Sequence, residues 1–403
     1  MFKKSLLLFS LFFVTTSFLN AQTISSIVEN TYNKNYTLKA LEESIKVAKQ
    51  EIELSSKWTN PTLSFGLTDI QFDEVTRRDL EPMQAAFVGI TQSIPLGDKL
   101  KISEKIARND YQISKYLVEE QKLQYRAKIY EYIYNIKLLK ERLSLFEEFK
   151  RNTLNLENLL KELYKFNKAN QAQILNTQIM QQELNLKSQK LKTLLNTITL
   201  RLEQITYEKI ENIDIDTNIK KIQLSLNIDS HPKILSLMQV SKKFDNLSKL
   251  EKEKKNSDIK VSLTYFQRDN KYKDYANLSF AIPLSVYGKE DIKSKKAKFN
   301  EIETNHKLED IKLTFKNQIK TYQQNIEDSI ITLNIIKKDI LPKYNQLQKV
   351  LETYNSFSST NIDSKSLINN FNEIIKYKLK VLAEKENYFN TLAKSSYYTK
   401  EIK

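Results

Sequence analysis

The chain has 403 residues, of which 28% are charged, and it contains only 4 Gly, 6 Pro and no Cys. So few turn-forming residues exclude a fold of many short elements and predict long, uninterrupted helices, and the lack of Cys excludes disulfides. The formal net charge of +15 weakly indicates a contact surface for acidic partners.

Residues 1–21 have the features of a secretory signal peptide. Met1 to Lys4 is basic, the following stretch SLLLFSLFFVTTSFL is apolar, and Ala21 offers a small residue for cleavage before Gln22. The alternative is an uncleaved N-terminal anchor. No later apolar run has the length of a membrane-spanning helix, which needs about 20 residues.

The rest of the chain reads as two tandem repeats, residues 22–207 and 208–403. Each repeat is predicted to contain a moderate helix, two short strands around a polar loop, and a long helical hairpin. In the first repeat these are a helix at 38–57, strands near 62–70 and 85–94, and a hairpin at 98–206. In the second they are a helix at 232–255, strands near 259–267 and 276–284, and a hairpin at 288–400.

The predicted strands have two different faces. Leu63, Phe65 and Leu67 alternate with small polar residues, and the strand that begins at Ile259 alternates in the same way. Aromatic residues on or near the strands suggest an interfacial girdle; they are Phe65, Phe72, Phe87, Tyr265, Tyr272 and Tyr275. Such strands can cross a bilayer when tilted, but four cannot close a barrel, so several chains would have to share one. The alternative is a pair of half-exposed hairpins in a soluble domain.

The long hairpins carry narrow apolar stripes on otherwise charged helices, which indicates helices packed side by side. The stripes include Leu191, Leu195, Ile198, Leu202 and Ile205 in the first repeat, and Phe371, Ile375, Leu379 and Leu382 in the second. The first arm, from Lys99 to Phe166, lacks Pro and Gly and at ~1.5 Å per residue would extend over about 100 Å. Polar residues interrupt the stripes near 167–170 and 356–363, where we predict the hairpin bends.

Each second strand is followed by an Ile-Pro-Leu corner. The sequence GITQSIPLGDK contains Pro95 and Gly97, and SFAIPLSVYGK contains Pro283 and Gly288. Pro suits the end of a strand because it lacks the N–H that a strand ladder needs, and Gly can relax the chain through a bend. We therefore predict two strand-to-helix corners, which differ in shape because Gly288 lies farther from its Pro.

With these motifs in this order, the mature chain resembles the TolC-like outer-membrane efflux protein family over essentially its whole length. The resemblance rests on the strand start NPTLSFG at 60–66, on both corner motifs, and on ILPKY at 340–344 leading to LETY at 351–354. It implies a mainly α protein with β structure, in which duplicated strand pairs and helical hairpins build a trimeric 12-stranded transmembrane β-barrel continued by a periplasmic α-helical barrel. It also implies a passive outer-membrane exit duct without enzymatic activity.

The resemblance further implies partners and site residues. The protein would be a homotrimer in outer-membrane lipid, docked to a periplasmic adaptor (a membrane fusion protein) that links it to an inner-membrane efflux pump. The adaptor-contacting tips would be Phe166, Asn167, Asn170, Phe357 and Asn361, and the periplasmic gate candidates are Asp363 and Glu373. The family usually has Gly where Asn167 and Phe357 stand here; Asn tolerates a left-handed backbone and Phe tolerates it poorly.

The sequence offers no catalytic, cofactor-binding or metal-binding motif. Its two histidines, His231 and His306, are isolated, and neither a Gly-rich phosphate loop nor a nucleophile elbow is present. We therefore expect no enzyme and no cofactor. The runner-up function is a non-pore periplasmic or surface coiled-coil scaffold. A basic helical nucleic-acid binder ranks third, and the signal peptide argues against nucleic acid as a partner.

Overall fold

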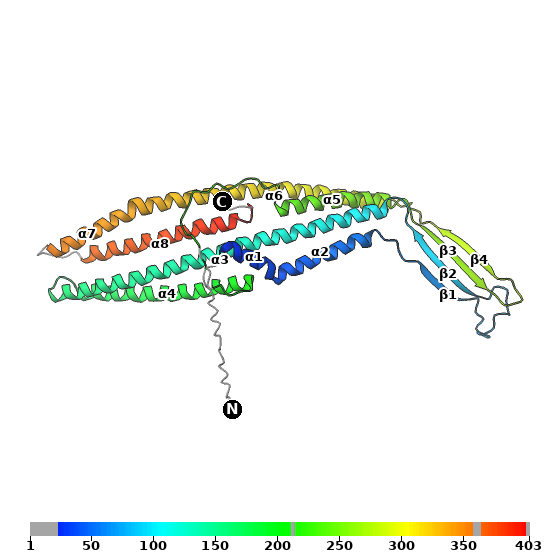
Figure 1. The fold of residues 1–403 in the computed structure, drawn as a ribbon, viewed down its shortest axis with the longest axis horizontal. Coiled ribbons are helices and arrows are strands. Elements are labelled where there is room, and N and C mark those ends of the chain that lie inside the picture. Colours follow the sequence, from blue (N-terminus) through cyan, green and yellow to red (C-terminus); the bar gives the residue numbers. More distant parts are fainter. Residues whose placement is uncertain (1–22, 211–212, 214, 358–363, 400–403) are drawn as a thin grey trace, which may run out of the picture. The chain divides into compact units, whose positions relative to one another are not determined.

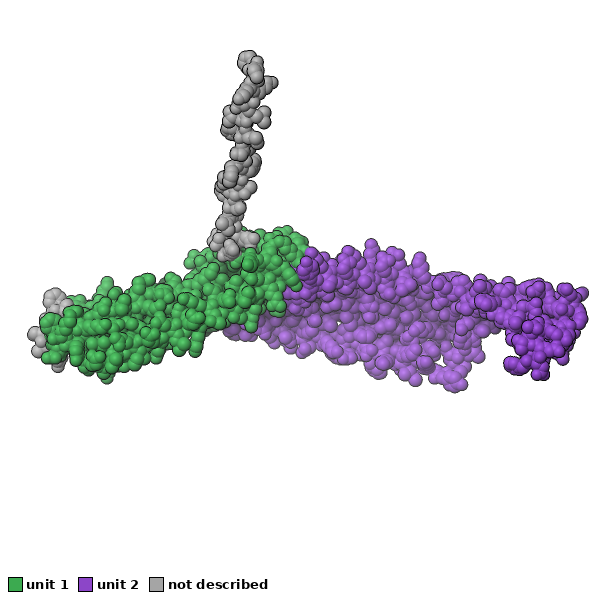
Figure 2. All heavy atoms as spheres, turned by 90° about the horizontal axis from the view of Figure 1, so that it is seen from below, with its two compact units in different colours: residues 1–34, 128–221, 328–390 green, residues 35–127, 222–327, 391–403 purple. Residues whose placement is uncertain are grey.

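The structure is a computed structural model that describes residues 23–210, 213, 215–357 and 364–399, so the signal peptide prediction for residues 1–21 lies outside the described residues. The chain forms two compact units (Figure 2). Unit 1 comprises residues 1–34, 128–221 and 328–390, and unit 2 comprises residues 35–127, 222–327 and 391–403. Each unit takes segments from both sequence repeats, so the division into repeats stays a prediction.

Unit 2 contains a four-stranded antiparallel sheet in which the strands lie side by side in chain order (Figure 1). The strands are β1 (Thr62–Thr68), β2 (Ala85–Ile94), β3 (Ile259–Gln267) and β4 (Tyr275–Ala281). All four overlap the strands that the alternation predicted, but the fourth, predicted near 276–284, ends earlier, at Ala281. The last strand ends before Pro283, because Pro has no N–H with which to continue the ladder.

The helices of unit 2 are α2 (Tyr36–Ser55), α5 (Pro232–Glu253), and the first parts of α3 (Lys99–Lys165) and α6 (Lys289–Asn334). Clear start signals mark α2 and α5. Asn35 caps α2 by accepting the Leu38 amide at 3.1 Å, which satisfies one of the free N–H groups of the first turn. His231 caps α5 in the same way, and Pro232 occupies the first helical position, where no N–H is needed.

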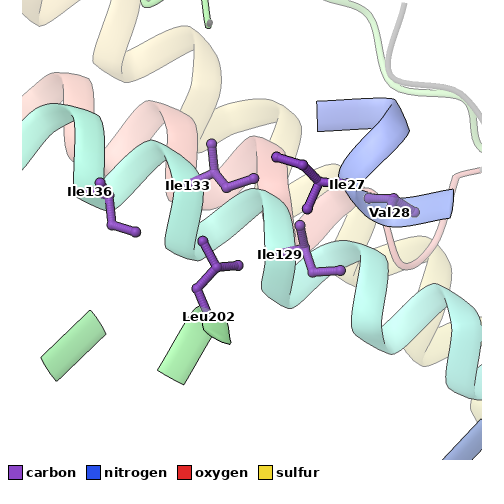
Figure 3. Close-up of a cluster of buried hydrophobic side chains, with 6 residues drawn as sticks. All are labelled: Ile27, Val28, Ile129, Ile133, Ile136 and Leu202. Atoms are coloured by element: carbon purple, nitrogen blue, oxygen red, sulfur yellow. The ribbon is translucent and has the colours of Figure 1, made fainter. Parts of the chain in front are cut away.

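Unit 1 is helical. It contains α1 (Ile24–Lys34), the rest of α3, α4 (Gln171–Thr206), α7 (Leu341–Phe357) and most of α8 (Ser364–Ser395). One core cluster joins Ile27 and Val28 of α1 to Leu202 of α4 and to Ile129, Ile133 and Ile136 of α3 (Figure 3). Leu195, Ile198 and Ile205 pack against this cluster, so the predicted heptad stripe of α4 faces the core.

The stripe of α8 is buried in the same manner. Ile375 joins Phe146 and Phe149 of α3 and Leu184 of α4 in a second cluster, against which Phe371 and Leu379 pack. Each such side chain contributes about 1.5–3 kcal/mol when fully buried, so the narrow stripes stabilise the packing of these helices. Long helices with one small antiparallel sheet confirm the predicted mainly α class.

One local feature was not predicted. A π-helix, labelled η1, spans Ile335–Ile340 between α6 and α7, and the Leu341 amide donates to the Ile336 oxygen. Pro342 is the second residue of α7, and an interior Pro removes a hydrogen bond and crowds the preceding turn. A wider turn next to it relieves that conflict without ending the helix.

Candidate functional site

The sheet of unit 2 has one apolar face, which we define by the rows that its register places across the strands. The central row runs through Leu63, Ile90, Leu263 and Leu278, which are direct cross-strand partners. These four side chains are 49–64% exposed. Water-exposed Leu and Ile in a continuous row are unfavourable in a soluble protein, so this face indicates contact with lipid or with another apolar surface.

The opposite face, the polar face, carries small polar side chains. One row comprises Ser64, Gly89, Thr264 and Asn277, and the next comprises Thr62, Thr91, Ser262 and Ser279. The hydroxyls of Thr91 and Ser262 share a hydrogen bond of 2.7 Å. Gly89 is required here, since an added Cβ would lie 2.7 Å from the Thr264 hydroxyl oxygen. In these two rows the polar face therefore carries only small or short polar side chains.

A third row on the polar face consists of aromatic rings. Its partners in register are Gly66, Phe87, Phe266 and Tyr275, and we call the three rings the aromatic row. The predicted girdle is therefore wrong in part. Phe65 and Tyr265 occupy the apolar face. Phe87 and Tyr275 lie on the polar face, because each is an odd number of residues from the apolar-face residues of its own strand and side chains alternate along a strand. Phe72 and Tyr272 lie in the loops.

Both edges of the sheet are open. Across the described part of the chain, β1 pairs only with β2 and β4 pairs only with β3. Each edge strand thus presents a row of backbone N–H and C=O groups that need a partner wherever water is excluded.

The first corner is tied tightly to the connection between α5 and β3. Gly97 has a φ of +72°, and an added Cβ would collide with the Glu253 carboxylate. That carboxylate accepts the Asp98 amide at 3.3 Å, and Lys99 pairs with Asp258. Pro95 lies in the short segment between β2 and α3.

The second corner is open. Gly288 has a φ of +65°, and nothing lies within 4 Å of an added Cβ. Pro283 sits in the segment that joins β4 to α6. Both Gly residues adopt the left-handed conformation, and the two corners differ in their surroundings; a difference in their shape stays a prediction.

The first hairpin bend, predicted near 167–170, lies between the end of α3 at Lys165 and the start of α4 at Gln171. Asn167 has a φ of +55°, the left-handed conformation in which Asn substitutes for Gly. Asn170 caps α4 in a capping box with Gln173, and Phe166 is 71% exposed. Of the second bend, Phe357 ends α7, while Asn361 and Asp363 lie outside the described residues. Glu373 lies in α8 and pairs with Lys376 at 2.9 Å. Whether these residues contact an adaptor or form a gate stays a prediction.

The two histidines lie in different surroundings. His306 is exposed on α6, whereas His231 is 4% exposed and forms ring contacts with Phe315 and Tyr397. Within the described ranges no group of three or more His, Asp or Glu side chains is placed to hold a metal ion. None of the described helices combines the length and apolarity that crossing a bilayer requires.

The described chain thus combines long helices with a small sheet that has one apolar and one polar face. No family model matches the sequence, and no curated protein matches it significantly. Solved structures do match. The open state of the MtrE outer membrane channel of Neisseria gonorrhoeae aligns with a TM-score of 0.76 at 10% identity, over 93% of this chain and 88% of that chain.

Two further structures agree. The CmeC outer membrane channel of Campylobacter jejuni gives a TM-score of 0.71 at 12% identity, over 94% of this chain and 87% of that chain. The outer membrane protein VceC of Vibrio cholerae gives 0.68 at 9% identity, over 92% and 96%. The chain therefore has the TolC-like fold, which confirms at the level of the fold the family resemblance seen in its sequence.

Proposed function

We propose that three copies of this chain form a passive exit duct in the outer membrane. The observation that carries the proposal is a sheet with an exposed apolar face, a polar face and two open edges. An unpaired backbone group in hydrocarbon costs several kcal/mol, so a membrane sheet has to close on itself. Four strands from each of three chains give a 12-stranded barrel, with the apolar face toward lipid and the polar face toward water.

The strand directions suit such a closure. Neighbouring strands are antiparallel throughout, so β1 and β4 run in opposite directions. The open edge of β4 in one chain can therefore continue the antiparallel ladder onto β1 of the next chain. We further propose that the helices continue the duct through the periplasm as an α-helical barrel. There the bends would contact an adaptor, and through it an inner-membrane efflux pump that supplies the energy.

A disulfide test addresses the closure directly, because the natural chain has no Cys. Within one chain, β1 and β4 are separated by three strand spacings of ~4.8 Å, or about 14 Å, whereas a disulfide spans at most about 7 Å between Cα atoms. We expect Cys pairs that join position 62 or 64 to position 277 or 279 to yield covalent trimers under oxidation.

The matched control is Thr264→Cys with Asn277→Cys, since these residues face each other inside one sheet. It should leave only monomers after denaturation. If none of the edge pairs gives a species larger than the control, closure between β1 and β4 is refuted.

A second experiment separates the duct from the coiled-coil scaffold. The full protein should fractionate with the outer membrane, run as an oligomer in detergent and conduct ions across a planar bilayer. A soluble monomer without conductance would favour the scaffold instead.

A further inference from the structure

The aromatic row stands out because it interrupts a face that is otherwise small and polar. The rings of Phe266 and Tyr275 stack with centroids 4.8 Å apart and planes 9° apart. The ring of Phe87 continues the row at 5.8 Å from Phe266. Phe87 and Phe266 are half-buried and Tyr275 is 38% exposed, so the rings are not a closed core.

The row is held at one end by Arg268. The guanidinium lies 5.2 Å from the centre of the Tyr275 ring and 5.6 Å from that of Tyr272, which places it in cation–π contact. Its Nε donates to the Lys273 oxygen at 2.7 Å and its Nη1 to the Pro82 oxygen at 3.2 Å. These bonds fix the guanidinium, so the rings are ordered before any ligand arrives.

At its other end the row meets bare backbone. A Cβ on Gly66 would lie 2.9 Å from Cε1 of Phe87, so the ring lies directly over the Gly66 backbone. The strand β1 therefore contributes no side chain that could cover Phe87 from this direction. An apolar ring remains available on the side of the sheet that faces water in the proposed duct.

Several charged groups in the two loops next to the row already have partners. Asp79 pairs with Arg77 at 3.0 Å and with Lys271 at 3.1 Å. Asp274 accepts the main-chain amide of Arg268 at 2.8 Å and the Tyr265 hydroxyl, and the Arg268 guanidinium is held by main-chain oxygens and the Tyr275 ring. What the row offers to a passing molecule is the edges and faces of aromatic rings, which favour other rings in edge-to-face or offset-stacked contact.

We propose that the aromatic row is a transient binding site for aromatic rings of cargo inside the duct, an inference that rests on the proposed function. Three copies around a threefold axis would give three such sites near the β1–β2 and β3–β4 loops. Binding has to be weak and repeated for cargo to leave, and isolated ring contacts have that strength. A purely structural alternative is that the rings only fix strand register across Gly66.

Single-channel recording in planar bilayers separates these possibilities. The probes are N-acetyl-tryptophanamide and N-acetyl-leucinamide, which are both neutral and differ in having or lacking an aromatic ring. We expect the tryptophan probe to cause brief current reductions that the leucine probe does not cause. Replacing all three rings by Leu (F87L, F266L and Y275L) should shorten these events at least fivefold, while Ser262→Ala, on the same face, should not.

The outcomes are distinct. Equal blocking by both probes, or unchanged events in the triple variant, would refute the proposed binding site. If the triple variant fails to assemble, the single variant Tyr275→Leu, at the edge strand, tests the same point and should still shorten the events. Absence of conductance in the natural protein would instead overturn the proposed function, and this site with it.

Discussion

His231 donates through Nε2 to the main-chain oxygen of Tyr397 at 3.0 Å, while its Nδ1 accepts the Lys233 amide at 3.1 Å. One buried imidazole thus joins the start of α5 to the segment that follows α8. The Tyr397 hydroxyl donates to Glu120 at 2.9 Å, and Arg126 donates to the Thr399 oxygen at 2.6 Å. A cavity of about 360 Å³ adjoins this cluster and is lined by Ser225, Asn227 and Ser230 among others.

Burial of the imidazole against Phe315 and Tyr397 makes this region sensitive to pH, because a charged ring is disfavoured there and a protonated Nδ1 can no longer accept the Lys233 amide. Burial lowers the pKa of His231 from its ordinary value of 6.5, and the charges of Lys233 and Arg126 lower it further. The Tyr397 carbonyl and Glu120 raise this pKa, but burial is the larger effect. His231 therefore binds a proton more tightly in the unfolded chain than in the folded one. The contribution of the neutral imidazole to folding stability is present above pH 6.5 and is lost as the pH falls below that value. We expect hydrogen exchange at 391–399 to increase in acid beyond the intrinsic effect.

Variants of the two histidines test that expectation. His231→Gln should lose about 1 kcal/mol of local stability through the missing cap, and with it most of the pH dependence at 391–399. The side chain of His306 is exposed, so the His306→Gln variant should behave like the natural protein. An unaltered pH response in His231→Gln would show that another group titrates.

The two corner glycines provide a matched pair for a stability experiment. Both have positive φ, so Ala at either position should cost roughly 1 kcal/mol for the left-handed conformation. Only Gly97→Ala also displaces the Glu253 carboxylate, which accepts the Asp98 amide and an Asn256 amide hydrogen. We expect Gly97→Ala to lower the unfolding temperature more than Gly288→Ala does. Equal losses would mean that Glu253 rearranges without cost.

The sequence was most informative where a period changes from two to the helical one. Leu63, Phe65 and Leu67 revealed a strand with one apolar face, and the heptad stripe ending at Ile205 revealed a packed helix. Such patterns are local and depend only on spacing. Polar residues at the first bend were equally visible, and Asn167 adopts the conformation that its chemistry permits.

Features that depend on register were missed. Phe87, Phe266 and Tyr275 form a row only because three strands distant in sequence align, and alternation within one strand cannot reveal this. These aromatic residues nevertheless fall on the alternate positions, between the apolar residues of each strand, and that parity predicts that they lie on the polar face. The bond between His231 and Tyr397 joins residues 166 apart, and no local pattern announces it.

Neighbouring residues on β4 test the assignment of the two faces. Leu278→Arg places a charge on the apolar face and should cost about 2–4 kcal/mol if that face meets the centre of the bilayer. Asn277→Arg places the same charge on the polar face, where water can solvate it. We expect Leu278→Arg to reduce the oligomer recovered from the outer membrane and Asn277→Arg to change the conductance. Equal recovery of both variants would contradict the assignment.

The left-handed residue at the first bend can be tested by substitution in both directions. Asn167→Gly should be neutral or slightly stabilising, whereas Asn167→Val should cost roughly 1–2 kcal/mol, because a β-branched residue fits a φ of +55° poorly. Thermal unfolding measures the difference. If the bend also contacts an adaptor, Asn167→Val should weaken crosslinking to it more than Asn170→Ala does, because the latter removes only a helix cap.

The two gate candidates should differ in their effects. Glu373 is already paired with Lys376 at 2.9 Å, and the ammonium group offsets much of the electrostatic potential of the carboxylate. Removing the Glu373 carboxylate should therefore have only a small effect on ions in the duct. Asp363 belongs to the predicted second bend, where a threefold ring of carboxylates would favour cations. We expect Asp363→Ala to lower the cation-to-anion permeability ratio roughly twofold and Glu373→Ala to lower it less. Reversal potentials in a salt gradient measure both, and an unchanged ratio in Asp363→Ala would remove Asp363 from the gate.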